Sequence, residues 1–150
     1  MSVTSTDHYI LFTVAETTYA LPSDQVAHIE MVEQITRVPN AASFVDGVVF
    51  SRGQVVPAVN MRVRFGFERA ERDLRTRLLV VQDGGRSIGL LVDACREFLT
   101  IPAASVQPPG DGLTGIGGRY LAGIATLNGR LIVILNLQAL LDSAEPILAA

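Results

Sequence analysis

The chain has 150 residues, a net charge of −3 at neutral pH and 49% hydrophobic residues. A chain of this length buries most of its surface as one domain without disulfides or metals. No uncharged apolar run approaches the roughly 18–20 residues that span a bilayer, and the start of the chain lacks the pattern of a signal peptide. We therefore expect a cytoplasmic protein without membrane insertion, with a flexible N-terminus (1–7), one folded domain (8–142) and a C-terminal tail (143–150).

Residue usage excludes several kinds of chemistry. All 12 basic residues are arginine, so no lysine is present for a GK[ST] phosphate loop or for a Schiff base. The single cysteine, Cys95, excludes an internal disulfide and a zinc site built from several thiolates, and its apolar surroundings predict a buried packing residue. Two isolated histidines do not make a metal site. We expect neither a metal nor a cofactor.

The first part of the chain alternates β-forming runs with turn residues. Residues 9–14 and 17–21 are rich in β-branched and aromatic side chains and predict a hairpin. Ser23 or Asp24 is a suitable cap for one short helix that runs through His28.

The next hairpin is the most informative stretch of the chain. Residues 45–50 and 54–59 are apolar β-forming runs, joined by a turn that carries Arg52 and Gly53. Pro57, late in the second run, is typical of an edge strand. The pattern places a cation at a hairpin tip, which favours a display site over a catalytic one.

Six arginines crowd the segment after this hairpin: Arg62, Arg64, Arg69, Arg72, Arg75 and Arg77. Glu68, Glu71 and Asp73 are interleaved with them, which favours a solvated loop with local ion pairs. Two alternatives remain open, a docking rim for an acidic partner and the contact surface of a small-barrel nucleic-acid-binding module. The acidic net charge argues against nucleic acid.

Further β runs follow. Residues 77–82 and 87–92 predict a hairpin, and residues 96–101 one more strand. Asp93 comes directly after an apolar run, so we expect a half-buried carboxylate that accepts hydrogen bonds at a strand end. Residues 105–118 are dominated by proline and glycine and predict a surface loop.

The last hairpin has the clearest turn. Residues 120–127 and 130–135 are joined by Asn128 and Gly129, the dipeptide that best tolerates the positive φ angles of a type I′ turn. Asn136 then caps a final helical turn whose leucines face the core. About ten short strands with no long amphipathic helix between them predict small antiparallel barrels, not a parallel sheet.

An ordered set of segments resembles the CheW-like domain of bacterial chemotaxis adaptors. The segments are Phe12 to Val26 with Tyr19-Ala-Leu-Pro22, Gly47 to Arg62, Ile88-Gly-Leu-Leu-Val-Asp93, Tyr120-Leu-Ala-Gly123-Ile124, and Arg130-Leu-Ile-Val-Ile-Leu-Asn-Leu137. The resemblance runs from about residue 8 to residue 141. It implies an all-β fold with a few short helices, in which two five-stranded SH3-like β-barrels pack over a shared hydrophobic core.

The resemblance also implies a function. A CheW-like adaptor is non-catalytic and couples the cytoplasmic tip of a chemoreceptor to the regulatory domain of a CheA-type histidine kinase in signalling arrays. Arg52, Gly53 and Arg62 are then candidate receptor contacts, although Arg52 would serve the fold instead if it bonded its own backbone carbonyls. We expect a monomer in isolation. Candidate kinase contacts, if their strands face outward, are Val38, Val45, Val55 and Val56, and candidate structural positions are Gly47, Pro57, Asp93, Gly123, Asn128 and Gly129.

The chain departs from the family pattern at four positions: His28, Phe50, Ser51 and Asn60. The family commonly has carboxylates at the positions of His28 and Asn60, so we expect Arg52 or Arg62 to lack an acidic partner. Such a change favours an unusual receptor or a divergent pathway, for instance one controlling surface motility or pili. The remaining alternative is an enzyme built around Ser51, Asp93 and a histidine, which no spacing indicates.

Overall fold

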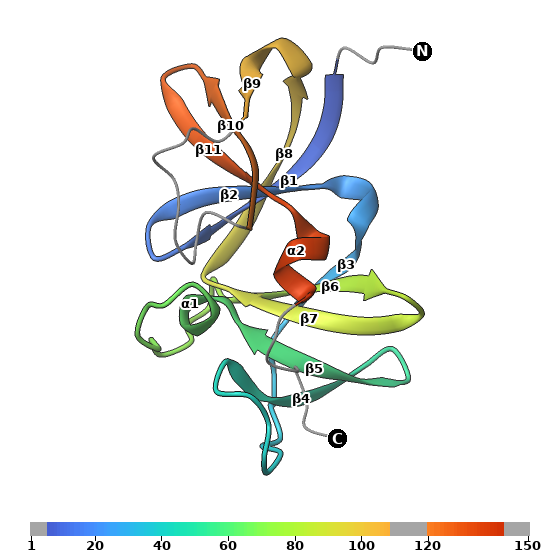
Figure 1. Ribbon diagram of the computed structural model, residues 1–150. Helices are drawn as coiled ribbons and strands as arrows, with labels where there is room; N and C mark the ends of the chain where they lie inside the picture. Colours follow the sequence, from blue (N-terminus) through green and yellow to red (C-terminus); the bar gives the residue numbers. More distant parts are fainter. Residues whose placement is uncertain (1–5, 109–119, 143–150) are drawn as a thin grey trace.

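The computed structural model describes residues 6–108 and 120–142 (Figure 1). Two residues expected in the flexible N-terminus, 6 and 7, belong to the first strand; residues 1–5 and the expected tail from 143 lie outside the described residues. The elements are β1 (Thr6–Val14), β2 (Thr17–Pro22), the 3-10 turn η1 (Ser23–Gln25), β3 (Val26–Met31), β4 (Val45–Ser51), β5 (Gln54–Asn60), α1 (Met61–Arg64), β6 (Arg77–Asp83), β7 (Arg86–Val92), β8 (Ala94–Pro102), η2 (Ala103–Ser105), β9 (Val106–Gln107), β10 (Leu121–Leu127), β11 (Arg130–Leu135) and α2 (Leu137–Leu141).

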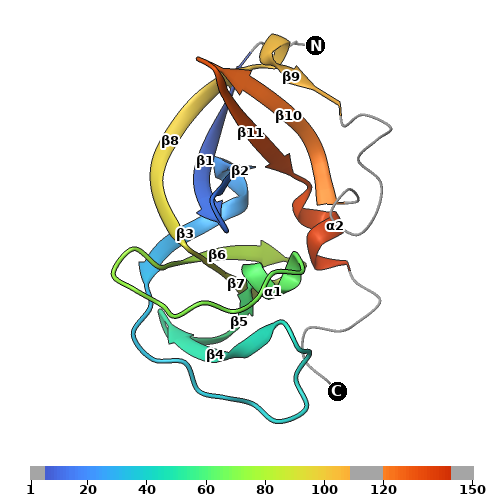
Figure 2. The same ribbon diagram turned by 90° about the vertical axis from the view of Figure 1, so that its left-hand side faces the viewer.

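The strands form two sheets, one in each lobe of the molecule. One sheet has the order β8-β1-β2-β11-β10-β9 and the other β3-β6-β7-β5-β4. Each contains two antiparallel hairpins joined by one parallel pair, β2 with β11 and β5 with β7. Strands β3 and β8 carry the chain from one lobe to the other (Figure 2). The expected fold of two small SH3-like barrels is confirmed, with the two-residue β9 added to the first sheet.

The predicted hairpins are present and share one turn geometry. Both residues of each two-residue turn have positive φ, which is the type I′ arrangement that matches the twist of the flanking strands. The φ values are 49° and 72° for Ala15 and Glu16, 49° and 82° for Arg52 and Gly53, 58° and 88° for Gly84 and Gly85, and 52° and 80° for Asn128 and Gly129.

The helix predicted from Ser23 or Asp24 through His28 is wrong. Only Ser23–Gln25 forms a 3-10 turn, and Val26–Met31 is the strand β3. This strand pairs with β6, so its backbone groups are satisfied across the sheet, which a helix of one turn does not achieve. In a strand the side chains of His28 and Glu30 lie on the same face.

The edge position expected for the strand with Pro57 is also wrong, because β4 is the edge strand and β5 lies between β4 and β7. Proline is tolerated in β5 because the parallel pairing with β7 covers only Ala58 to Asn60. The missing N–H of Pro57 therefore removes no bond from that ladder.

The predicted loop from 105 to 118 is shorter at its start than expected. Val106 and Gln107 form β9 and pair with β10, whereas residues 109–118 lie outside the described part of the chain. Gly123 permits this pairing, because a Cβ there would lie 3.0 Å from the carbonyl oxygen of Gln107 and 2.8 Å from Val106 Cγ1.

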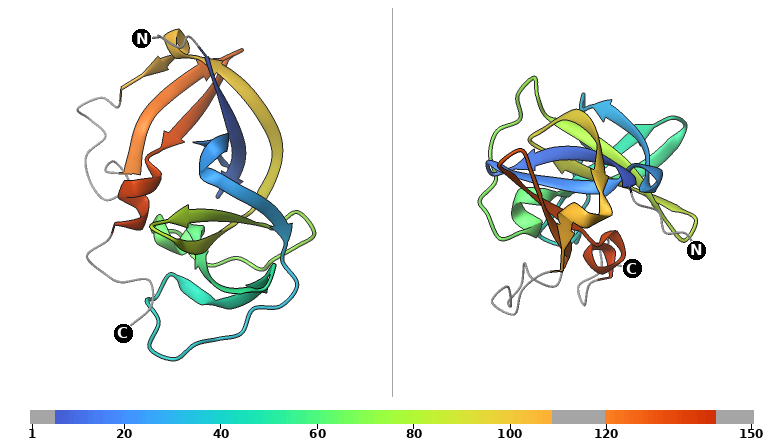
Figure 3. Two further views of the ribbon diagram at one scale, coloured as in Figure 1. Left: turned by 90° about the vertical axis from the view of Figure 1, so that its right-hand side faces the viewer. Right: turned by 90° about the horizontal axis from the view of Figure 1, so that it is seen from above.

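A shared hydrophobic core joins the lobes. One buried cluster combines side chains from both sheets and from α2, among them Phe12, Leu21, Leu79, Leu90 and Leu140. Two smaller clusters belong to one sheet each. Helix α2 lies between the lobes (Figure 3), and the Asn136 side chain caps it as predicted. In residues 6–108 and 120–142, no helix is long and apolar enough to cross a bilayer.

Candidate functional site

The tip of the β4–β5 hairpin displays a cation beside apolar side chains. Arg52 has φ 49°, in the left-handed region that a non-glycine residue adopts at a cost of about 1 kcal/mol. Its side chain is 69% exposed. Phe50 and Val55 form a cross-strand pair next to it and are 76% and 65% exposed. The positive φ belongs to the turn geometry that all four hairpins share, whereas the exposure leaves the guanidinium open to solvent.

A polar cluster lies beneath this tip and connects β4 to β3. The Ser51 hydroxyl donates to Glu30 Oε2, and His28 Nε2 lies 2.6 Å from the same oxygen and 3.1 Å from Ser51 Oγ. Arg52 Nε is 3.9 Å from this oxygen. Two of the departures from the family pattern, His28 and Ser51, are therefore in direct contact. Glu30 was missed in the sequence because its place beside His28 depends on β3 being a strand.

This cluster does not have the geometry of a serine triad. In a triad, one ring nitrogen of the histidine contacts the serine and the other contacts the acid. Here one nitrogen, Nε2 of His28, approaches both groups, and Ser51 donates to the carboxylate itself. Ser51 is only 4% exposed. Asp93, the acid expected in the enzyme alternative, bonds other residues, so the proposed grouping of Ser51, Asp93 and a histidine is wrong.

Arg62 does have a carboxylate partner, contrary to the expectation from the departures. Its Nε and Nη2 atoms donate to Asp93, at 2.7 Å for Nη2 to Oδ2. The hydrogen bond with Asp93 is the main cause that raises the pKa of Arg62. Asp93 Oδ2 also accepts from the Ala15 N–H at 2.8 Å, so this half-buried carboxylate ties α1 to the β1–β2 turn. The predicted role of Asp93 at a strand end is confirmed.

Asn60 replaces a carboxylate with a group that both donates and accepts. Its amide nitrogen donates to Asp46 Oδ2 at 2.9 Å, and its carbonyl oxygen caps α1 by accepting from the Val63 N–H at 3.2 Å. Asp46 also pairs with Arg69 at 2.8 Å. A carboxylate at position 60 could not donate to Asp46. The amide is therefore matched to its neighbours.

Within the arginine-rich segment, Arg75 pairs with Asp73 at 3.1 Å, a local ion pair of the predicted kind. Arg62 and Arg69 instead pair with Asp93 and Asp46, which lie outside the segment. The guanidinium carbon of Arg64 lies 4.6 Å from the ring centre of Phe44 and 4.9 Å from that of Tyr120. These internal partners argue against the nucleic-acid alternative, which needs arginines that are free to bind phosphates.

The four candidate kinase-contact valines differ in exposure. Val55 is exposed and Val38 is half-buried, whereas Val45 and Val56 are 7% and 1% exposed. The expectation of outward-facing side chains is wrong for Val45 and Val56, because both faces of this sheet are covered and these residues belong to buried clusters.

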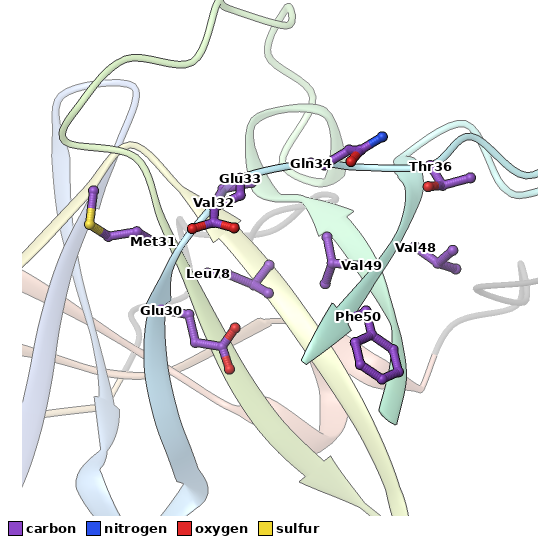
Figure 4. Close-up of a pocket in the computed structure, with 10 residues that line it drawn as sticks. All are labelled: Glu30, Met31, Val32, Glu33, Gln34, Thr36, Val48, Val49, Phe50 and Leu78. Carbon is purple, nitrogen blue, oxygen red and sulfur yellow. The ribbon is translucent and has the colours of Figure 1, made fainter. Parts of the chain in front are cut away.

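A groove runs between β3 and β4, the two edge strands of the five-stranded sheet (Figure 4). Its volume is ≈ 500 Å³. At one end, Thr36, in the segment that follows β3, forms a backbone bridge to Val48 of β4 through two hydrogen bonds of 2.9 and 2.8 Å. Gly47 permits this approach, because a Cβ there would lie 2.2 Å from the Thr36 oxygen. The groove is lined by Glu30, Met31, Val32, Glu33, Gln34, Thr36, Val48, Val49, Phe50 and Leu78.

Comparison with known proteins shows similarity to CheW-like proteins in both sequence and structure. The profile of the CheW-like domain matches residues 8–145. A chemotaxis protein CheW from Rhizobium meliloti is 31% identical over 136 residues, which are 91% of this chain and 88% of that protein. The chemotaxis protein CheW of Klebsiella aerogenes is 28% identical over 137 residues, 91% of this chain and 82% of that protein. The crystal structure of the scaffolding protein TtCheW from Thermoanaerobacter tengcongensis superposes with a TM-score of 0.85 and 27% identity, covering 95% of this chain and 97% of that one.

Proposed function

Because the chain belongs to the CheW-like domain family and is a chemotaxis coupling adaptor, we propose that it links the cytoplasmic tip of a methyl-accepting chemoreceptor to the regulatory domain of a CheA-type histidine kinase. The observation that carries this proposal is Arg52, held in left-handed backbone geometry at an exposed hairpin tip. A receptor tip is a helical bundle that presents leucine-type side chains and carboxylates. An arginine fork beside exposed Phe50 and Val55 is complementary to such a surface.

The kinase would contact the apolar edge of the same sheet. β4 is an edge strand, and Met31, exposed on β3, lines the groove between β3 and β4, which leaves the Phe50–Val55 pair beside Arg52 to the receptor. Exposed apolar side chains on a strand edge are typical of a docking surface. A contact of about 1,600 Å² or less suits an array that assembles from many weak copies.

The proposal includes no chemistry by the adaptor itself. The adaptor brings two proteins together. It is a monomer in the cytoplasm and is recruited to membrane-associated receptor arrays. The alternative, which the departures from the family pattern favour, is a divergent chemosensory pathway that controls surface motility or pili.

Binding measurements test the proposal. Purified protein is titrated by calorimetry against the isolated kinase regulatory domain and against a soluble fragment of the receptor tip, both from the same genome. Arg52→Glu should lower receptor affinity by 1 to 4 kcal/mol, roughly 5- to 1,000-fold, with a melting temperature within a few degrees of wild type. Arg96→Glu, which changes an exposed arginine on β8, is the matched control and should leave affinity unchanged.

Two results would contradict the proposal. Unchanged receptor affinity in Arg52→Glu would remove Arg52 from the receptor contact. Failure of the wild-type protein to bind either the kinase domain or the receptor fragment would remove the coupling function.

A further inference from the structure

The outer half of the β4–β5 hairpin has few backbone ties to the rest of the sheet. β5 pairs with β7 only at Ala58 to Asn60, and β4 is an edge strand. The bridge from Thr36 holds β4 at Val48, three residues before Ser51. The turn that carries Arg52 therefore extends beyond the last backbone bonds that anchor the hairpin.

Hydrogen bonds of two side chains, Gln54 and Ser51, hold this outer half, and these side chains differ in burial. Gln54 Oε1 accepts from the Ser87 hydroxyl at 3.0 Å, an exposed bond. On the other side, the buried Ser51 hydroxyl donates to Glu30 on β3. A buried bond to a charged acceptor is stronger than an exposed neutral one, because water competes less for its atoms. The contact to β3 is therefore the main restraint on the tip.

His28 completes this restraint. Its Nε2 lies 2.6 Å from Glu30 Oε2 and 3.1 Å from Ser51 Oγ, so the imidazole contacts both partners of the Ser51–Glu30 hydrogen bond. Contacts from Ser51 on β4 and from His28 on β3 therefore hold the carboxylate between the two strands. Ser51 immediately precedes Arg52, so fixing the serine also limits where the arginine fork can point.

We propose that His28, Glu30 and Ser51, here called the polar latch, are positioning residues that hold the hairpin tip so that Arg52 meets a carboxylate on a helical partner. The proposal rests on the proposed receptor contact of Arg52 and adds the residues that orient it. The latch acts through Arg52 and does not itself contact the receptor. It joins β3 to β4 at the tip, whereas the bridge from Thr36 to Val48 joins the segment after β3 to β4 nearer the base of the hairpin.

Hydrogen exchange tests the latch without any partner. The variants are Ser51→Ala, Glu30→Ala and Glu30→Gln, where the glutamine keeps an oxygen that accepts from Ser51. The amides of residues 50–54 should exchange roughly 5- to 30-fold faster in Ser51→Ala and Glu30→Ala, and less than about threefold faster in Glu30→Gln. The matched control is Thr100→Ala, which removes the hydroxyl of an exposed threonine–histidine pair in the other sheet and should leave these amides unchanged.

Exchange at the β10–β11 hairpin is measured in the same spectra. Faster exchange confined to the tip supports the latch. Wild-type exchange at the tip in Ser51→Ala, or equally faster exchange in both hairpins, overturns it. Glu30→Gln and Ser51→Ala keep the test decisive if Glu30→Ala does not fold.

Binding to the receptor-tip fragment then tests whether the latch acts through Arg52. Ser51→Ala should weaken binding about 5- to 20-fold in the wild-type background and by no more than about twofold in the Arg52→Ala background. Equal effects in both backgrounds overturn the positioning role. If Arg52→Ala alone binds like wild type, the proposed receptor contact is wrong, whereas the exchange data still decide whether the latch holds the tip.

Discussion

Replacing Arg52 with asparagine separates the display of a cation from the stability of the turn. Asparagine tolerates positive φ better than arginine and is common in type I′ turns. At φ 49° the substitution should relieve up to about 1 kcal/mol of backbone strain. It also removes the ion pair with Glu30, which at 3.9 Å and with the arginine side chain 69% exposed contributes between 0 and about 1 kcal/mol. The free energy of unfolding should therefore stay within about 1 kcal/mol of wild type, with an increase the favoured result.

The assay pairs urea unfolding with calorimetric titration of the receptor-tip fragment. Arg52→Asn should keep its unfolding midpoint but lose 1 to 4 kcal/mol of binding, roughly 5- to 1,000-fold in affinity. The chain offers a reciprocal control, because Asn128 has φ 52° in the equivalent position of the β10–β11 turn. Asn128→Arg should lower stability by up to about 1 kcal/mol and leave binding unchanged.

Two outcomes would refute this reasoning. A loss of more than about 2 kcal/mol in the stability of Arg52→Asn would mean that the arginine supports the fold, the alternative in which it bonds its own backbone. Within the described residues, Arg52 donates no such bond, and it forms an ion pair with Glu30. If Arg52→Asn is stable and binds the receptor-tip fragment with wild-type affinity, the receptor does not contact the cation at the tip.

Substitutions at Gly47 and Asp93 and the labelling rate of Cys95 test the local structure. Gly47→Ala places a Cβ 2.2 Å from the Thr36 oxygen at φ 148°, so urea unfolding should show a loss of at least about 2 kcal/mol; a loss under 0.5 would contradict the close approach. Asp93→Ala leaves Arg62 and the Ala15 N–H without their acceptor and should lower the free energy of unfolding by about 1–3 kcal/mol. Asp93→Asn keeps one oxygen and should lower it less; equal losses in the two variants would contradict the role of Asp93 as the shared acceptor. Burial raises the pKa of Cys95 from 9.0 to about 11, which leaves roughly a hundredfold less thiolate at pH 7.5. A thiol reagent should therefore label Cys95 at least tenfold more slowly in the native protein than in the urea-unfolded protein. Equal labelling rates would place Cys95 at the surface.

The hairpins could be predicted from the sequence because their turns are local. A two-residue turn with positive φ selects a few dipeptides, such as Asn128 with Gly129, and flanking β-forming runs are equally local. The strand β3 could not be predicted this way. Its six residues fit one helical turn as well as a strand, and pairing with β6, far along the chain, decides between them. The position of Pro57 in the sheet depends on the parallel pairing of β5 with β7, which no local pattern encodes.

The candidate site was predictable only where it is a turn. Arg52 and Gly53 follow from the hairpin pattern, whereas Glu30 joins them only because β3 and β4 are the two edges of one curved sheet. Val45 and Val56 were candidate kinase contacts only on the condition that they face outward, and both are buried. Alternation reports which residues share a face, but not whether both faces of a sheet are covered, and here both are.

The departures from the family pattern are better understood as matched sets than as lost partners. His28 and Ser51 contact the same carboxylate oxygen of Glu30, so each is suited to the presence of the other two. Asn60 likewise donates to Asp46, which a carboxylate at that position would repel. Single reversions toward the family residues should therefore disturb these networks. We expect the three latch residues to act as a unit in positioning the cation at the tip.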